Sequence, residues 1–137
     1  MEDTDTPLST FRAFQDVLGA SCSELSAYLD EPLEKVQDYA SAKLIPPIEL
    51  ISKLYELVRE LDDRADMIAE AIEDQIFEAG EEPEQVIIKV PSSTSEASKE
   101  GLHFYQFGVR SALLGASRAG VDAIITTEAS PKKQPKR

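Results

Sequence analysis

Residues that build reactive centres are scarce in this chain. It has one cysteine, Cys22, one histidine, His103, and no tryptophan. A single cysteine excludes an internal disulfide and a cysteine-based metal site. Cys22 and His103 are 81 positions apart in the sequence, which gives little support to a Cys/His catalytic pair. The sequence also lacks a glycine-rich phosphate loop and the acidic spacing of an EF-hand. We therefore expect no enzyme activity, no cofactor and no small-molecule ligand, and we interpret His103 as structural or solvated.

Long apolar runs are absent as well. No apolar run reaches about 18 residues, the length that a membrane-spanning helix needs. The first five residues are largely acidic, unlike the basic start of a secretory signal. These features predict a cytoplasmic protein without membrane contact.

Basic residues are few, but their distribution is uneven. The chain has 14 basic and 26 acidic residues, a net charge of −12, which argues against a general nucleic-acid binder. Residues 1–45 carry −6, residues 46–82 carry −9, residues 83–130 carry −1 and residues 131–137 carry +4. Residues 46–82 therefore hold the largest share of the negative charge, and this segment need not lie near a binding surface.

Two short helices are predicted in succession near the start of the chain. Pro32 cannot continue a helix but can open one, and Ser21 and Glu24 have the spacing of a capping box. We predict helices over about 22–30 and 32–42. Their apolar residues form one pair four apart and one pair three apart, so each pair shares a helix face: Leu25 and Leu29, Val36 and Tyr39.

This spacing resembles the helix-turn-helix of the Cro/lambda-repressor type. Ser26 stands where that family usually has a small alanine, and Asp30 stands where it usually has a turn glycine. Glu31 departs from the family, which usually has an apolar residue there. The resemblance implies that the second helix enters the major groove of DNA; an ordinary helical hairpin is the alternative.

Helices flank this motif on both sides. Thr6 and Pro7 suit the start of a helix over about 7–18, with Phe11, Phe14 and Leu18 on one face and Gly19 as its stop. A long helix is predicted from 47 to 79, which either bends near 61–63 or is covered by another chain. Leu50, Tyr55 and Leu57 widen its apolar stripe, whose members are Ile48, Ile51, Leu54, Val58, Leu61, Ala65, Ile68, Ile72 and Ile76.

The second half of the chain reads as strand, helix, strand. Strands are predicted over 86–90 and 121–127, with a helix over about 102–119 between them and Ser95 as a possible cap of a short extra helix. Gly108, Gly115 and Ala116 leave room on the main helix for another backbone. The strands either lie parallel or meet across a dimer axis, and because two strands make a poor sheet alone, we expect a homodimer.

The whole order of elements resembles the anti-CRISPR-associated autorepressors of phages and mobile elements, chiefly over the string from Phe104 to Ile125. The resemblance implies a dimeric transcriptional repressor of its own operon at an inverted repeat. The expected fold is mainly α (α+β), with a helix-turn-helix domain at 6–60 and a dimerisation domain at 61–128, which contains the second half of the long helix. A disordered basic tail at 129–137 either holds phosphates or aids solubility.

The second helix of the motif supplies the predicted DNA contacts. Gln37 is the best candidate base reader, since its amide can pair with adenine N6 and N7; a merely solvated glutamine is the alternative. The outward-facing set is Leu33, Glu34, Gln37, Asp38 and Ser41, and the expected phosphate contacts are Lys35 and Lys43, with Arg12 and Lys53. Because Glu31, Glu34 and Asp38 repel phosphate, a protein-interaction module that has lost DNA binding is the competing hypothesis.

Overall fold

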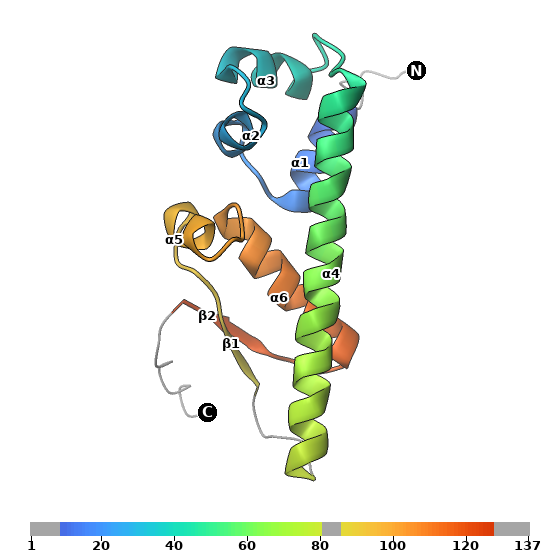
Figure 1. Ribbon diagram of the computed structural model, residues 1–137, viewed down its shortest axis with the longest axis vertical. Helices are drawn as coiled ribbons and strands as arrows, with labels where there is room; N and C mark the ends of the chain where they lie inside the picture. Colours follow the sequence, from blue (N-terminus) through green and yellow to red (C-terminus); the bar gives the residue numbers. More distant parts are fainter. Residues whose placement is uncertain (1–8, 81–85, 128–137) are drawn as a thin grey trace, which may run out of the picture. The chain divides into compact units, whose positions relative to one another are not determined.

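The structure is a computed structural model that describes residues 9–80 and 86–127 (Figure 1). Within these residues the chain is mainly helical, with one two-stranded sheet, which confirms the predicted mainly α (α+β) class. The chain divides into two compact units, Met1–Glu60 and Leu61–Arg137. That they serve as DNA-binding and dimerisation domains stays a prediction. Thr6, Pro7 and the tail at 129–137 lie outside the described residues. None of the described helices has the length and apolar content to cross a membrane.

Helix α1 (Thr10–Leu18) opens the first unit. The prediction that it begins at Pro7 is wrong, because Ser9 is the N-cap and its hydroxyl accepts a hydrogen bond from the Arg12 N–H at 3.2 Å. Gly19 ends the helix with a φ of 68°, as predicted.

Helices α2 (Cys22–Leu29) and α3 (Leu33–Ala40) form the predicted pair. The capping box at the start of α2 is confirmed: Ser21 N–H donates to Glu24 Oε1 at 2.9 Å, and Glu24 N–H donates to Ser21 Oγ at 3.0 Å. The bounds of α3 differ from the predicted 32–42. Pro32 is extended with a ψ of 138°, so it precedes the helix, and Ala42 turns the chain away with a φ of 67°.

Side chains of α1, α2 and α3 meet in the core of the first unit. The four apolar residues of the motif, Leu25, Leu29, Val36 and Tyr39, are buried, as predicted. The rings of Phe11 and Tyr39 lie 5.7 Å apart, and Ser9 Oγ donates to the Tyr39 carbonyl at 2.7 Å. One serine therefore caps α1 and also fixes the C-terminal end of α3.

Helix α4 (Ile48–Ala79) is one unbroken helix that includes residues 61–63. Whether it bends there or is covered by another chain stays a prediction. The buried face of α4 differs from the predicted stripe, because Ile48 is exposed while Ile51, Val58, Ile68 and Ile76 are only half-buried. The apolar residues of α4 cover more of the helix surface than one packing face needs. The sequence does not specify which of them pack against the neighbouring helices. The buried residues are Leu50, Leu54, Leu57, Leu61, Ala65, Ala69 and Ile72.

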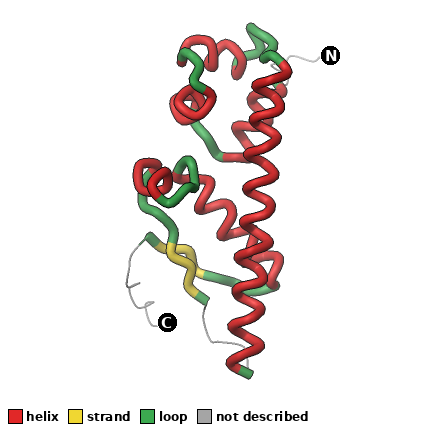
Figure 2. The backbone as a smooth tube through the Cα atoms, in the orientation of Figure 1, coloured by secondary structure: helices red, strands yellow, loops and turns green. Residues whose placement is uncertain are grey.

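The second unit joins two parallel strands by a helical crossover. Strand β1 (Ile87–Lys89) pairs with β2 (Ile124–Thr126) in the register Ile87 with Ile124, and Figure 2 shows the two strands side by side. Of the two arrangements left open by the sequence, parallel pairing within one chain is the observed one. Both strands are shorter than predicted.

Helices α5 (Thr94–Lys99) and α6 (Tyr105–Ala119) form the crossover. Ser93, and not Ser95, caps α5 by accepting from the Glu96 N–H at 3.1 Å. The predicted start of α6 at residue 102 is wrong, because His103 has a φ of 64° and interrupts the helical path. The His103 ring instead packs 5.2 Å from that of Phe107, in keeping with a structural role.

Helix α6 lies close against α4 within the second unit. A Cβ placed on Gly115 would lie 2.6 Å from Ile68 Cγ2 and 2.9 Å from the Ala65 carbonyl oxygen, so the predicted close approach of another backbone is confirmed. Nearby, Arg118 Nη1 donates to the Asp62 carbonyl at 2.9 Å and to Asp66 Oδ1 at 2.8 Å. The hydrogen bond with the Asp62 carboxylate raises the pKa of Arg118, despite the opposing effect of desolvation.

Candidate nucleic-acid interface

The turn between α2 and α3 is fixed by hydrogen bonds around Ser26. The Ser26 carbonyl accepts from the N–H groups of Asp30 and Glu31, and Ser26 Oγ donates to the Glu31 carbonyl at 2.6 Å. Asp30 adopts the left-handed conformation that the sequence predicted, with a φ of 56°. In Figure 1, α2 is seen nearly end-on while α3 runs across the view, so the turn sets a steep crossing between them.

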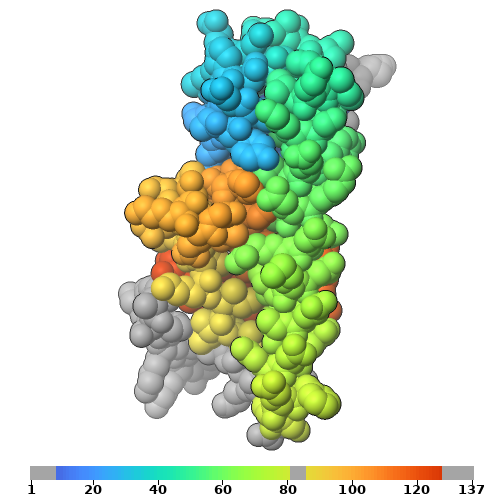
Figure 3. Space-filling model, viewed as in Figure 1, coloured from blue at the N-terminus to red at the C-terminus, as the bar shows by residue number. Residues whose placement is uncertain are grey.

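The solvent-facing side of α3 carries most of the predicted contact residues. Val36 and Tyr39 face the core, which turns the intervening Gln37 to solvent, and Figure 3 shows part of α3 uncovered on this face of the first unit. Asp38 is half-buried and is the one predicted contact residue that does not lie fully open. The exposed members of the set are Leu33, Glu34, Lys35, Gln37, Ser41 and Lys43.

The electrostatics of this side are mixed. Residues 31–43 contain three acidic and two basic side chains. Lys35 Nζ lies 4.0 Å from Glu31 Oε1, so its charge is partly compensated before any ligand arrives. Lys43 is held beyond the end of α3 by its N–H, which donates to the Asp38 carbonyl at 2.8 Å. Lys35 and Lys43 lie near opposite ends of α3, so they offer two separate phosphate contacts rather than a continuous basic surface.

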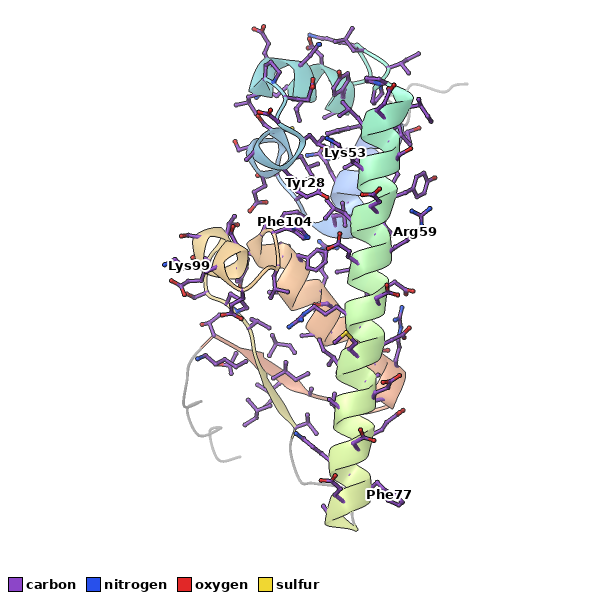
Figure 4. All side chains as sticks on the ribbon, in the orientation of Figure 1. Tyr28, Lys53, Arg59, Phe77, Lys99 and Phe104 are labelled. Carbon is purple, nitrogen blue, oxygen red and sulfur yellow. The ribbon has the colours of Figure 1, made fainter. Side chains whose placement is uncertain are left out.

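The two further predicted phosphate contacts are less well placed. Arg12 Nε lies 3.4 Å from Asp16 Oδ1, one turn along α1, and both side chains are mostly exposed. Lys53 belongs to α4, and in Figure 4 it lies with Tyr28 between α2 and α4. The candidate interface is therefore limited to α3 and the residues directly after it.

An exposed apolar group that the sequence did not predict lies beside this candidate interface. After Ala42 the chain presents three aliphatic side chains to solvent: Leu44 is 42% exposed, Ile45 91% and Ile48 70%. The sequence signal was the Pro46-Pro47 pair, which fixes the loop but does not show which side chains it exposes. Exposed aliphatic groups of this kind favour contact with another protein over contact with phosphate.

Tyr28, on α2, is a partly buried phenol that lies near the acidic side chains of Glu56 and Glu60. Burial raises the pKa of Tyr28 above its ordinary value of 10.0, and the charges of Glu60 and Glu56 raise it further. The folded protein therefore keeps the phenol proton to higher pH than the unfolded chain does. The stability due to this difference is intact below about pH 10 and is lost as the pH rises through the folded pKa.

We expect the Tyr28→Phe variant to lose stability less steeply than the wild-type protein above about pH 10, because phenylalanine cannot ionise. The measurement is the free energy of unfolding by urea, taken at several pH values on either side of that point. Parallel curves for the two proteins would contradict the assignment.

Comparison with known proteins adds no family to this geometry: no protein-family model, no curated protein and no solved structure matches the chain. Among the described residues, no group of three or more His, Cys, Asp or Glu side chains is placed to hold a metal ion. The helix pair and its exposed side chains are therefore the features of this chain that indicate a function.

Proposed function

We propose that this protein is a sequence-specific DNA-binding transcriptional repressor. It acts as a homodimer and binds an inverted repeat that serves as the operator of its own operon. The observation that carries the proposal is the side of α3 that bears Gln37, which lies open to solvent while the other side is anchored in the core. A helix presented in this way has the form of a major-groove recognition element. We propose that the repressor acts in the cytoplasm.

The side chains on α3 suit direct readout supported by a few phosphate contacts. Gln37 carries an amide that donates to and accepts from adenine in the major groove, and Glu34 can accept from cytosine N4. Lys35 and Lys43 supply positive charge near the two ends of the helix. Because the acids beside them oppose non-specific attraction, binding should depend on base contacts more than in a strongly basic protein.

A gel-shift titration against the protein's own upstream region, at ~0.15 M salt, tests the proposal. We expect a discrete complex at submicromolar dimer that excess unrelated DNA does not displace. Folded protein that gives no shift at micromolar dimer would overturn the proposal. Circular dichroism of the same sample verifies that the helices are formed.

We expect Gln37→Ala to weaken operator binding roughly 5- to 150-fold, the loss that corresponds to about 1–3 kcal/mol for a bidentate base contact. Binding to unrelated DNA should stay unchanged, because that binding depends on phosphate contacts. Fluorescence anisotropy with labelled duplexes measures both affinities. Gln75→Ala, at an exposed glutamine of the second unit, is the matched control. An equal loss of affinity for the operator and for unrelated DNA would show that Gln37 does not read a base.

A second candidate function is a protein-interaction module whose helix-turn-helix no longer binds DNA. The exposed Leu44, Ile45 and Ile48 favour it, together with the acids on α3. A pull-down from nuclease-treated lysate distinguishes the candidates. A partner that survives nuclease and is lost with Ile45→Ser, alongside no DNA affinity, would support this function; recovery of no partner would reject it.

A further inference from the structure

The sheet of the second unit has two outer edges, and neither has a neighbouring strand among the described residues. Among the described residues the sheet contains only β1 and β2. Ile124 N–H donates to the Val86 carbonyl at 2.8 Å, and Val90 N–H donates to the Thr126 carbonyl at 2.8 Å. Successive residues of a strand direct their backbone groups to opposite sides, so the N–H and C=O of Ile125 point away from β1. By the same alternation, those of Ile87 and Lys89 point away from β2.

The two edges differ in how well they suit pairing. On β1 the outer edge carries Lys89, whose side chain is exposed, and edge lysines are a common means of preventing strand addition. On β2 the residues are Ile124, Ile125 and Thr126, all uncharged, β-branched and half-buried. The edge of β2 is therefore the better place for another strand.

The remaining residues of this unit have a composition that disfavours strands. Residues 81–85 and 128–137 contain three prolines, Pro83, Pro131 and Pro135, and one apolar residue, Ala129. Proline lacks the N–H that a sheet ladder requires, and polar segments add no apolar cover. The segment 121–127, in contrast, contains no proline and is rich in β-branched residues.

We propose that β2 pairs with β2 of a second copy, antiparallel and about a twofold axis at Ile125. The inference rests on the homodimer of the proposed function and specifies its interface. In this register each Ile125 exchanges both backbone hydrogen bonds with Ile125 of the second copy, and Ile124 lies opposite Thr126 of that copy. The product is a four-stranded sheet in the order β1-β2-β2-β1, which overcomes the weakness of two isolated strands.

An open groove at the start of β2 fits this register. The groove has a volume of about 480 Å³ and lies between the end of α6 and residues 120–123. The register brings Thr127 of the second copy beside Ala123, which lines the groove. Leu113 lines the same groove and is 52% exposed in the single chain, so the second copy would reduce the exposed apolar surface there.

Disulfide trapping between two differently substituted proteins tests the register. In a Cys22→Ser background, one preparation carries Ile124→Cys and the other carries Thr126→Cys. Residues opposite each other in a non-hydrogen-bonded antiparallel pair have Cα atoms about 4.5 Å apart, within the range of a disulfide. We expect the mixture to form a cross-linked dimer under mild oxidation. Either variant alone should not, because its two cysteines would lie about 8 Å apart.

The matched control repeats the mixture on β1, with Ile87→Cys and Lys89→Cys, and we expect no cross-link there. A cross-link on β1 instead of β2 would overturn the proposal. So would sedimentation of the full chain at a mass of 15.1 kDa, and not twice that mass, at ~0.1 mM. Circular dichroism of each variant establishes that the helices are intact.

The test also separates this inference from the proposed function. A β2 cross-link in a protein with no DNA affinity would reject the repressor and keep the interface. A dimer that binds the operator without the cross-link would keep the repressor and reject the interface.

Discussion

Gly115→Ala is expected to destabilise the second unit by about 2 kcal/mol, although alanine favours helices by about 1 kcal/mol over glycine. The new methyl group would lie 2.6 Å from Ile68 Cγ2 and 2.9 Å from the Ala65 carbonyl oxygen. A backbone oxygen within a helix cannot move away cheaply, so α6 has to shift from α4. Hydrogen exchange of the α6 amides measures the loss, since it reports the local free energy of opening.

Gly108→Ala is the matched control on the same helix. Its new methyl group would lie 3.4 Å from Leu102 Cδ1 and from Pro91 Cδ, an ordinary contact. We expect this variant to equal or exceed the wild-type protein in stability, by up to about 1 kcal/mol. Equal stability of the two alanine variants would contradict the close packing of α6 on α4.

Phe11→Ala is expected to destabilise the first unit by about 3–5 kcal/mol, because it removes a fully buried ring and leaves a cavity beside Tyr39. The loss should reach α3, since Tyr39 belongs to that helix. We therefore expect faster hydrogen exchange of the α3 amides and weaker operator binding. Thermal unfolding followed by circular dichroism measures the overall effect.

Val17→Ala serves as its control, since Val17 lies on the same helix but is 51% exposed. Its effect should remain within about 0.5 kcal/mol. If Phe11→Ala left exchange in α3 unchanged, the packing of α1 would not support α3.

The sequence correctly predicted several helix ends at which the residues that form the end lie close to each other in the chain. The capping box of Ser21 and Glu24, the stop at Gly19 and the left-handed turn at Asp30 depend on residues within one helical turn, and all three are confirmed. The start of α1 was not predictable in this way. Thr6 and Ser9 both suit an N-cap, and Ser9 also bonds to Tyr39, 30 residues away, a contact that no local pattern reveals.

The buried face of α4 and the surroundings of the candidate site depend on tertiary packing, which the sequence alone did not specify. Helix α4 has apolar residues over more than one line of its surface, and its neighbours, not its periodicity, select Leu50 and Leu57 for burial. At the candidate site, the buried Val36 and Tyr39 correctly predicted that Gln37 faces solvent. The ion pair of Lys35 with Glu31 and the exposure of Ile45 depend on the conformation of the turn and loop, which the sequence did not specify.

Footprinting of the folded protein on its own upstream DNA tests the central claim, that α3 reads DNA from two copies at once. We expect two protected half-sites related by inverted symmetry, with centres about 34–36 Å apart or a multiple of that spacing. With Gln37→Ala, the same protection should require a roughly 5- to 150-fold higher protein concentration. Continuous protection without half-sites, or no protection at micromolar protein, would contradict this claim.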